Sequence, residues 1–313
     1  MSALLFPGQG SQLVGMGSEL YKEFGLVKKI FKQADEKLDF PISKLILEGP
    51  EDELQLTKNT QPAILTVSYS IFKILKEEFN FNFDSFKYFA GHSLGEYSAL
   101  VCSDSLNFND ALYLLHERGK AMQEAVPVGA GSMVAILGLK TDEIIKLLKE
   151  KNSENGVCEI ANDNADGQVI ISGNKEKINA FQILLKERKI KSIPLKVSAP
   201  FHCSLMQPAA KTMESKINGT QFNTPTYEII NNVTAKPEKN SEIIKKLLIQ
   251  QIYSTVRWRE SIINMTSSGV KNFIEIGPGK VLSGMVKRTA KGVNCFSINS
   301  ITDIKNFINE FKK

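Results

Sequence analysis

The segment FAGHSLGEYSAL, residues 89–100, holds a serine between two glycines where an apolar run meets a helix-like stretch. In a G-x-S-x-G segment, a strand turns sharply into a helix and the serine hydroxyl projects from the turn. Gly91 and Gly95 supply the room, Ser93 is the candidate nucleophile, and the Leu94 N–H is the candidate oxyanion donor. The competing interpretation is a glycine-rich helix start in which serine only caps the helix.

A serine nucleophile needs a base, and the chain contains three histidines. His92 adjoins Ser93, and because neighbouring side chains on a tight turn diverge, we expect it to pack or form hydrogen bonds. His116 lies in the helical stretch ALYLLHERGKAM, where a position at the surface or core edge is expected. His202 follows a strand and a proline in loop-like sequence, where functional residues concentrate, and is the predicted base. A helix cap or core role for His202 stays open, and no carboxylate is identified to orient its ring.

A second glycine-rich loop, in LLFPGQGSQ, follows the first predicted strand. Open α/β sheets bind ligands in loops at the carboxyl ends of their strands. Gln9 in this loop is therefore a candidate donor to a bound acyl group. The alternative is a tight turn that needs its glycines for backbone geometry and leaves Gln9 in solvent.

Short apolar runs alternate with helical segments along the chain, which predicts an α/β fold with a largely parallel, buried sheet. The segments singled out are strands at Leu4–Phe6, Tyr88–Ala90, Glu228–Ile230 and Phe273–Ile276, and helices at Gln61–Phe79 and Phe108–Ala125. Between Gly129 and Lys196 the order becomes βαββαβ, which is that of a ferredoxin-like unit.

We therefore predict a discontinuous core of residues 1–127 and 198–313, with residues 128–197 inserted as a small ferredoxin-like domain. A cleft between the two domains is the default place for a ligand.

The composition is that of an ordinary globular protein, with 313 residues of which 42% are hydrophobic. No apolar run approaches a membrane span, and MSALLFPGQG breaks at Pro7 before a secretory signal forms, so a cytoplasmic protein without membrane contact is expected. The four cysteines form no C-x-x-C pair, and no metal site is predicted. The net charge of +5 favours anionic ligands or an acidic protein partner, but it is too diffuse to predict nucleic-acid binding.

The segments FPGQGSQ, GHSLGEYSAL, RGKAMQEAVP, GSMVAILG, PFHCSLM, QIYSTVRW and EIGPGKVL together resemble the malonyl-CoA:acyl carrier protein transacylases of type II fatty acid synthesis. They are spread over nearly the whole chain. The resemblance implies an α/β-hydrolase-like core with a ferredoxin-like insert, in agreement with the strand order above. It also implies that Ser93 is the nucleophile, that His202 is its base, and that Gln9 and the Leu94 amide form the oxyanion hole.

The resemblance extends to the substrate. Arg118, in HERGKAM, would bind the malonyl carboxylate, and its planar fork suits a carboxylate better than lysine does. Gln251, beside Gln250, would orient His202 through a carbonyl oxygen where a hydrolase uses Asp or Glu. The family usually has proline where this chain has Thr255. Phe201 before the histidine resembles the malonyl-selective members.

The implied reaction moves a malonyl group from malonyl-CoA to the phosphopantetheine thiol of acyl carrier protein, through a malonyl-serine intermediate and with ping-pong kinetics. The coenzyme A thioester is the substrate, and no cofactor is expected. The family's acidic carrier protein suits the basic charge of this chain. Acylation would rise with pH through a group near the histidine reference of about 6.5.

Two other classes of function stay open on sequence grounds. A serine esterase or thioesterase would use the same elbow and histidine with water as the acceptor. A non-catalytic docking module for carrier protein would keep only the fold, and Ser93, His202 and Arg118 together argue against it.

Overall fold

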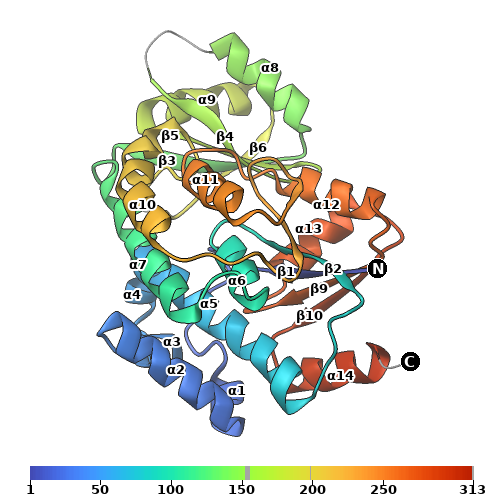
Figure 1. Ribbon diagram of the computed structural model, residues 1–313. Coiled ribbons are helices and arrows are strands. Elements are labelled where there is room, and N and C mark those ends of the chain that lie inside the picture. The colour runs from blue at the N-terminus through green and yellow to red at the C-terminus, as the bar shows by residue number, and fades with distance from the viewer. Residues whose placement is uncertain (152–155, 198, 312–313) are drawn as a thin grey trace.

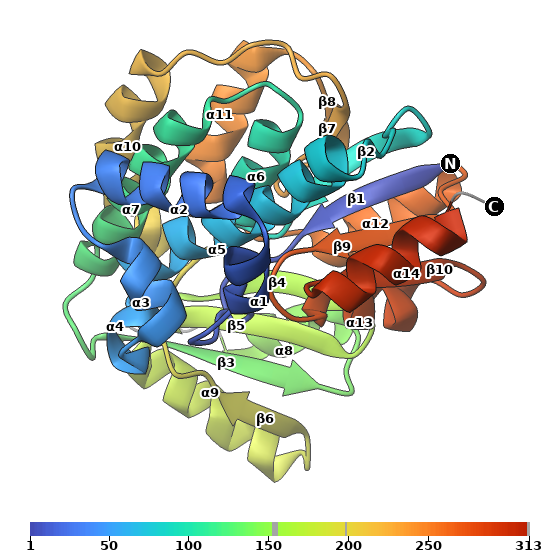
Figure 2. The same cartoon turned by 90° about the horizontal axis from the view of Figure 1, so that it is seen from below.

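The computed structural model describes residues 1–151, 156–197 and 199–311, and the statements below concern these residues. A larger α/β body holds both ends of the chain, and a smaller layer of sheet and helix lies at one end of it (Figure 1). Figure 2 shows the same division from below, with α9 (Lys175–Glu187) and β6 (Lys191–Pro194) at the periphery. No helix among the described residues is long and apolar enough to cross a membrane.

The larger body is built on a six-stranded sheet. Across the sheet the strands are β10 (Asn294–Ile298), β9 (Asn272–Ile276), β1 (Ser2–Phe6), β2 (Phe86–Gly91), β7 (Glu228–Ile230) and β8 (Pro237–Glu238). All neighbours pair in parallel except β7 and β8. The four predicted strands are confirmed. The two edge strands were missed because β8 has two residues and the side chains of β10 are mostly only half-buried.

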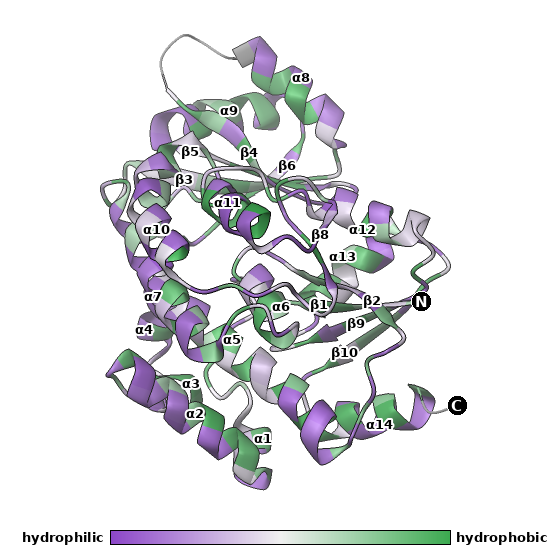
Figure 3. Ribbon diagram, in the orientation of Figure 1, coloured by the Kyte–Doolittle hydropathy of each residue, from purple (hydrophilic) through white to green (hydrophobic). Residues whose placement is uncertain are grey.

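Both faces of this sheet are covered, as expected of a parallel sheet. Side chains alternate along β1, so that Leu4 and Phe6 enter one apolar cluster while Ala3 and Leu5 enter another on the opposite face. Figure 3 shows hydrophilic and hydrophobic turns alternating along peripheral helices such as α2 (Gly25–Leu38). The core therefore consists of two apolar layers with the sheet between them.

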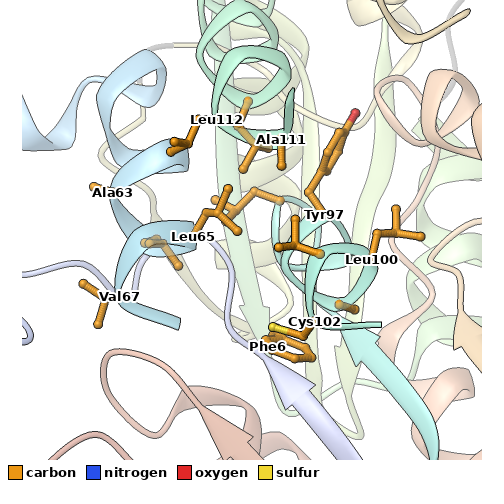
Figure 4. Packing of buried hydrophobic residues seen from close by; sticks show 14 of the residues in the cluster. Phe6, Ala63, Leu65, Val67, Tyr97, Leu100, Cys102, Ala111 and Leu112 are labelled. Atoms are coloured by element: carbon orange, nitrogen blue, oxygen red, sulfur yellow. The ribbon is translucent and has the colours of Figure 1, made fainter. Parts of the chain in front are cut away.

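The helices pack around the two sheets. In chain order they are α1 (Ser18–Glu23), α2, α3 (Ile42–Glu48), α4 (Glu51–Gln55), α5 (Thr57–Lys73), α6 (Gly95–Cys102), α7 (Phe108–Glu124), α8 (Thr141–Lys151), α9, α10 (Gln207–Gly219), α11 (Ser241–Gln251), α12 (Trp258–Ser267), α13 (Val281–Thr289) and α14 (Ile301–Phe311). A π-helical turn follows α5 at Ile74–Glu78, and a 3₁₀ turn precedes α10 at Ser204–Met206. Figure 4 shows side chains of β1, α5, α6 and α7 meeting in one cluster, among them Phe6, Leu65, Tyr97 and Leu112.

The two predicted long helices are present. α7 matches its prediction to within one residue, whereas α5 begins one turn earlier than predicted and becomes π-helical before Phe79. The early start was missed because its first turn, TKNT, carries no apolar periodicity. Pro62 lies inside α5 and has no N–H for the Lys58 carbonyl. His116 Nδ1 fills that gap with a hydrogen bond of 3.0 Å to the Lys58 oxygen.

The smaller layer is a four-stranded antiparallel sheet. Its strands, in order, are β4 (Cys158–Ala165), β5 (Gln168–Asn174), β3 (Gly131–Leu137) and β6. The βαββαβ order predicted for this segment is therefore present. The exact domain boundaries stay a prediction, and Ser198, at the predicted junction, lies outside the described residues.

The edge strand β4 ties this sheet to the larger body. The Val256 N–H donates to the Ala161 carbonyl at 2.8 Å, and the Asp163 N–H donates to the Val256 carbonyl at 3.0 Å. Thr255 Oγ1 donates to the Ile160 carbonyl at 2.5 Å. The segment after α11 thus pairs with β4 almost as a further strand.

Candidate active site

Two loops leave the same edge of the main sheet side by side. β1 and β2 are parallel, with Leu5 opposite Ala90 and Phe6 opposite Gly91, so that the loops that follow them begin together. These loops line a cavity of about 320 Å³, whose other wall comes from the smaller sheet. The cavity therefore lies where the sequence predicted a ligand, between the two sheets and beyond the carboxyl ends of parallel strands.

The serine elbow has the geometry predicted from its glycines. Ser93 has a φ of 54°, in the left-handed region, which costs an ordinary residue roughly 1–2 kcal/mol. A Cβ on Gly91 would lie 1.9 Å from the Gly95 carbonyl, and one on Gly95 would lie 2.2 Å from the Phe6 oxygen. The strained turn is held by a hydrogen bond of 2.7 Å from the Ser93 N–H to Asn232 Oδ1. Only glycines at both positions let the strand and helix approach this closely.

His202 meets the serine hydroxyl. Its Nε2 lies 2.8 Å from Ser93 Oγ, and its Nδ1 lies 2.9 Å from the main-chain carbonyl oxygen of Gln251. A carbonyl only accepts, so Nδ1 carries the proton and the unprotonated Nε2 faces the serine. Arg118 Nη2, which only donates, approaches Ser93 Oγ at 3.1 Å. The Ser93 proton is therefore directed at His202, as a nucleophile and its base require.

The His202 ring is buried, with 5% of its surface exposed. Burial and the positive charge of Arg118 lower the pKa of His202 to about 3. This changes the expectation from sequence, which placed the titration of the base near the reference of about 6.5. In the structure the imidazole is neutral, and ready to accept a proton, well below pH 6.5.

Arg118 is a buried cation in the lining of the cavity, with 1% of its surface exposed. Burial lowers its pKa, but a guanidinium stays charged in proteins. Its Nη1 donates to Gln61 Oε1 at 2.7 Å, and its Nη2 donates to Gln251 Oε1 at 2.8 Å. Its buried Nε has no partner among the described residues. Its partners other than Ser93 are neutral amides, and none of the carboxylates that the structure describes contacts it directly to compensate its charge.

Gln251 contributes to the site through both its main chain and its side chain. Its main-chain carbonyl oxygen accepts a hydrogen bond from His202 Nδ1, at the position where a hydrolase would use a carboxylate. Its side chain points elsewhere: Oε1 accepts from Arg118, and Nε2 donates to Glu96 Oε2 at 2.7 Å. The register that placed Gln251, rather than Gln250, beside the histidine agrees with these contacts.

The two candidate oxyanion donors both line the cavity. The Leu94 N–H follows the nucleophile directly and has no acceptor among the described residues. Gln9 Oε1 accepts from Thr57 Oγ1 at 2.8 Å, so the side chain is not simply solvated. The amide nitrogen of the Gln9 side chain is thus the end left to donate.

The other two histidines have structural contacts. His92 Nε2 lies 2.8 Å from Asn164 Oδ1, and its ring meets Trp258 edge-on, in agreement with the expected packing and hydrogen-bonding role. Burial lowers the pKa of His92. His116 is half-buried at the core edge and completes the α5 backbone, as described above.

Three polar residues of the site were missed in the sequence. Gln61 and Asn232 carry no local signal, because an amide in a helix or after a strand is usually solvated. Glu96 did carry one: it is the only charged residue of α6, a helix whose eight residues are all buried. A buried carboxylate in an apolar helix requires hydrogen-bond partners and therefore marks a site worth examining.

Comparison with known proteins places the chain in a family. Residues 3–312 match the acyl transferase domain. The malonyl CoA-acyl carrier protein transacylase of Haemophilus influenzae is 43% identical over 99% of this chain and 98% of that protein. The protein of the same name from Bacillus subtilis is 42% identical over 99% and 97%.

Solved structures agree over the whole length. The acyl-carrier-protein-S-malonyltransferase of Bartonella henselae has a TM-score of 0.96 and 39% identity, covering 100% of this chain and 99% of its own. A solved complex of a type II PKS acyl-carrier protein with its malonyl-transacylase contains a chain that matches this one with a TM-score of 0.94 and 38% identity, over 99% of both chains. The chain belongs to the acyl transferase domain family and, within it, to the malonyl CoA-acyl carrier protein transacylases.

Proposed function

We propose that this protein transfers a malonyl group from malonyl-CoA to the phosphopantetheine thiol of acyl carrier protein, and so supplies extender units for fatty acid synthesis. The observation that carries the proposal is the position of Ser93 Oγ, 2.8 Å from His202 Nε2 and 3.1 Å from Arg118 Nη2. A nucleophile and base pair is thus placed beside a cation that fits a substrate carboxylate.

In the first half-reaction, His202 Nε2 takes the Ser93 proton while Oγ attacks the thioester carbonyl. The Leu94 N–H and Gln9 donate hydrogen bonds to the oxyanion that forms. The carbon–sulfur bond then breaks, His202 returns the proton to the departing thiolate, and coenzyme A leaves. Malonyl-serine remains. The Gln251 carbonyl supports the proton-carrying ring without supplying a full negative charge.

Arg118 recognises the malonyl carboxylate. Once Ser93 Oγ is acylated, the Nη2–H that it accepted in the free protein becomes available, next to the unpartnered Nε–H. These two donors form one edge of the guanidinium, and such an edge can bind a carboxylate in a bidentate manner. A buried carboxylate requires such a partner, because its desolvation is otherwise too costly.

In the second half-reaction, the carrier thiol enters the same cavity and reverses the steps, which gives ping-pong kinetics. The basic charge of +5 favours approach of an acidic carrier protein. All the chemistry is assigned to side chains and amides, so we propose that no metal or cofactor takes part. A thioesterase would use the same residues with water as the acceptor. Binding of the malonyl carboxylate by Arg118 does not by itself favour water over a thiol.

The finer fold description is also part of the proposal. The order β4-β5-β3-β6, with α8 and α9 in the crossovers, supports a ferredoxin-like insert of residues 128–197. The elbow between β2 and α6 supports an α/β-hydrolase-like core of residues 1–127 and 198–313. The four cysteines are unpaired, which fits the reducing cytoplasm.

The test is direct. The protein is incubated with malonyl-CoA, and the modified peptide is mapped by mass spectrometry, first without and then with holo acyl carrier protein. We expect malonylation of Ser93 that persists in buffer and disappears as malonyl-carrier forms. Rapid loss of the label to water without the carrier would indicate a hydrolase, and no label at all would refute the proposed function.

A further inference from the structure

Glu96 is a buried carboxylate to which the reaction above gives no part. It lies three residues after the nucleophile on α6, and only 1% of its surface is exposed. Carboxylates are almost never buried this completely unless they are held by hydrogen bonds or an opposite charge. Its contacts therefore indicate what it does.

One oxygen of Glu96 accepts two hydrogen bonds. The main-chain N–H of Asn232 donates to Oε2 at 3.0 Å, and Gln251 Nε2 donates to the same atom at 2.7 Å. The other end of the Gln251 amide, Oε1, accepts from Arg118 Nη2 at 2.8 Å. Gln251 thus stands between a buried acceptor and a buried cation, with a different end of its amide toward each.

The orientation of that amide matters to Arg118. A side-chain amide has one accepting end and one donating end, whereas a guanidinium has only donors. If the Gln251 amide turned over, its NH₂ group would face Arg118 Nη2, and the guanidinium would lose this acceptor. Glu96 Oε2 opposes this most strongly, because it holds the NH₂ group at 2.7 Å, closer than the other two acceptors of that group, the Ser93 carbonyl at 3.2 Å and Asn232 Oδ1 at 3.4 Å.

Given malonyl transfer as proposed above, we propose that Glu96 is a positioning residue for substrate selectivity: it orients the Gln251 amide, and Gln251 holds Arg118 where the malonyl carboxylate binds. Glu96 touches neither the substrate nor Ser93 Oγ and acts through these two side chains. A neutral acyl group has no carboxylate for Arg118 to bind, so the arrangement favours malonyl over acetyl.

The role requires an accepting oxygen rather than a charge. Burial raises the pKa of Glu96 to about 7, against the opposing hydrogen bonds from Asn232 and Gln251 and the charge of Arg118. A proton added on the second oxygen, Oε1, leaves Oε2 free to accept both hydrogen bonds. A glutamine side chain can replace Glu96 here, because the Asn232 N–H requires an acceptor and therefore draws the amide oxygen to the position that Oε2 has in the wild type. Aspartate keeps the charge but is one methylene too short to reach both donors.

Two matched variants of Glu96 distinguish the effect of side-chain length from the effect of charge. For wild type, Glu96→Asp and Glu96→Gln, kcat/KM for acylation is measured with malonyl-CoA and with acetyl-CoA. We expect Glu96→Asp to lower the malonyl value about tenfold or more while the acetyl value stays within about threefold. Glu96→Gln should stay within about threefold of wild type with both substrates.

Each contrary result overturns the proposal. Equal losses with both substrates in Glu96→Asp would mean that Glu96 only supports the structure, and unchanged values would mean that it does not act on Arg118. A malonyl-specific loss in Glu96→Gln as large as in Glu96→Asp would assign the effect to charge. If wild type itself is not malonylated, the proposed function fails instead, which keeps the two failures distinct.

A second variant covers the case in which Glu96→Asp does not fold, as judged by thermal unfolding. Gln251→Met removes the amide that Glu96 orients and keeps the main-chain carbonyl that holds His202. We expect the malonyl value to fall by a larger factor than the acetyl value; some loss with both substrates is expected too, because the Gln251 side chain also donates to the Ser93 carbonyl at 3.2 Å. Unchanged selectivity in Gln251→Met would overturn the proposal without reference to Glu96.

Discussion

The two walls of the cavity are built differently. On the side of the larger body, Gln61, Ser93 and Arg118, here called the core wall, are polar and almost completely buried, with no more than 8% of any of these residues exposed. The small-sheet wall includes Ile170 and Leu195, which are apolar and only half-buried. The core wall carries the reacting and charge-binding groups, whereas this part of the small-sheet wall gives the cavity its shape.

The difference lies in what fixes each wall. Hydrogen bonds of the core wall join residues far apart in the chain, such as Ser93 to His202, 109 positions away, and Arg118 to Gln251, 133 positions away. The small-sheet wall is held to the core through the pairing of β4 with Val256. Substitutions in the core wall should therefore alter the rate of the reaction, and substitutions at the pairing of β4 with residues 255–256 should alter the free energy of unfolding.

The largest effect is expected at the nucleophile. Ser93→Ala should abolish acylation by malonyl-CoA, because no other hydroxyl is placed against His202 Nε2 in the described structure. The fold should persist, since a single hydroxyl contributes little to stability. Mass spectrometry of the intact protein gives the first result and circular dichroism the second. A malonylated peptide recovered from Ser93→Ala would show that the reaction does not belong to this part of the core wall.

The next largest effect is expected at the cation. Removing one member of a buried charge pair costs about 2–5 kcal/mol, and about 1.4 kcal/mol is tenfold. Arg118→Ala should thus lower kcat/KM for malonyl-CoA by at least about tenfold and up to about a thousandfold, while acetyl-CoA holds steady or improves. Arg118→Lys should recover only part of the loss, because an ammonium lacks the planar fork.

This result would show that residues of the core wall have separate roles: Arg118 recognises the substrate carboxylate, whereas Ser93 forms the bond to the acyl group. The control is acetyl-CoA with the same variants. If both substrates lose activity by the same factor, Arg118 supports the site or binds the shared coenzyme A portion, and its role in selectivity is refuted.

The elements and the candidate nucleophile and base could be predicted from the sequence for local reasons. The G-x-S-x-G turn, the alternation of strand and helix, and the scarcity of histidines each depend on short segments. They placed Ser93 at an elbow and left His202 as the base, and the structure brings the two within hydrogen-bond distance.

The electrostatics of the site were not accessible, because they arise from long-range contacts. Nothing near His202 in the chain indicates that burial and Arg118 lower its pKa to about 3. Nor does the sequence show that the Gln251 side chain, 155 positions from Glu96, connects that carboxylate to the cation. The sequence identifies which ionisable side chains are present, but their burial and neighbours in the fold determine which of them are neutral.

A smaller effect is expected where the segment after α11 pairs with β4. Thr255 stands where the family usually has proline, and its hydroxyl donates to the Ile160 carbonyl of β4. Thr255→Val keeps the shape and removes the hydrogen bond, so the free energy of unfolding should fall by about 1 kcal/mol. Thr255→Ser, which keeps the hydroxyl, is the matched control. Urea denaturation measures both, and equal stability of the two variants would show that this hydrogen bond contributes nothing.

The smallest effect is expected from pH, and it tests the burial of the core wall. The folded pKa of His202, about 3, lies below its unfolded reference of about 6.5. The base is therefore neutral in the folded protein at all pH values well above 3, and kcat/KM for acylation should change by less than about twofold between pH 8 and pH 5.

Stability should respond to pH where activity does not. Below pH 6.5 the unfolded chain takes up a proton at His202 that the folded protein does not, so the stability due to the neutral ring is present above 6.5 and declines as the pH falls toward 3, by up to about 1.4 kcal/mol per unit. Glu96 acts in the opposite direction, because its raised pKa of about 7 lets the folded protein keep a proton that the unfolded chain releases above about 4.5. The comparison is therefore made with His202→Gln: the free energy of unfolding of wild type relative to this variant, measured in urea at each pH, should decrease from pH 6.5 to pH 5, while acylation of the folded wild type stays constant. An inflection of kcat/KM near pH 6.5 would instead mean that water reaches His202 in the working protein, and that the core wall is less closed than its contacts indicate.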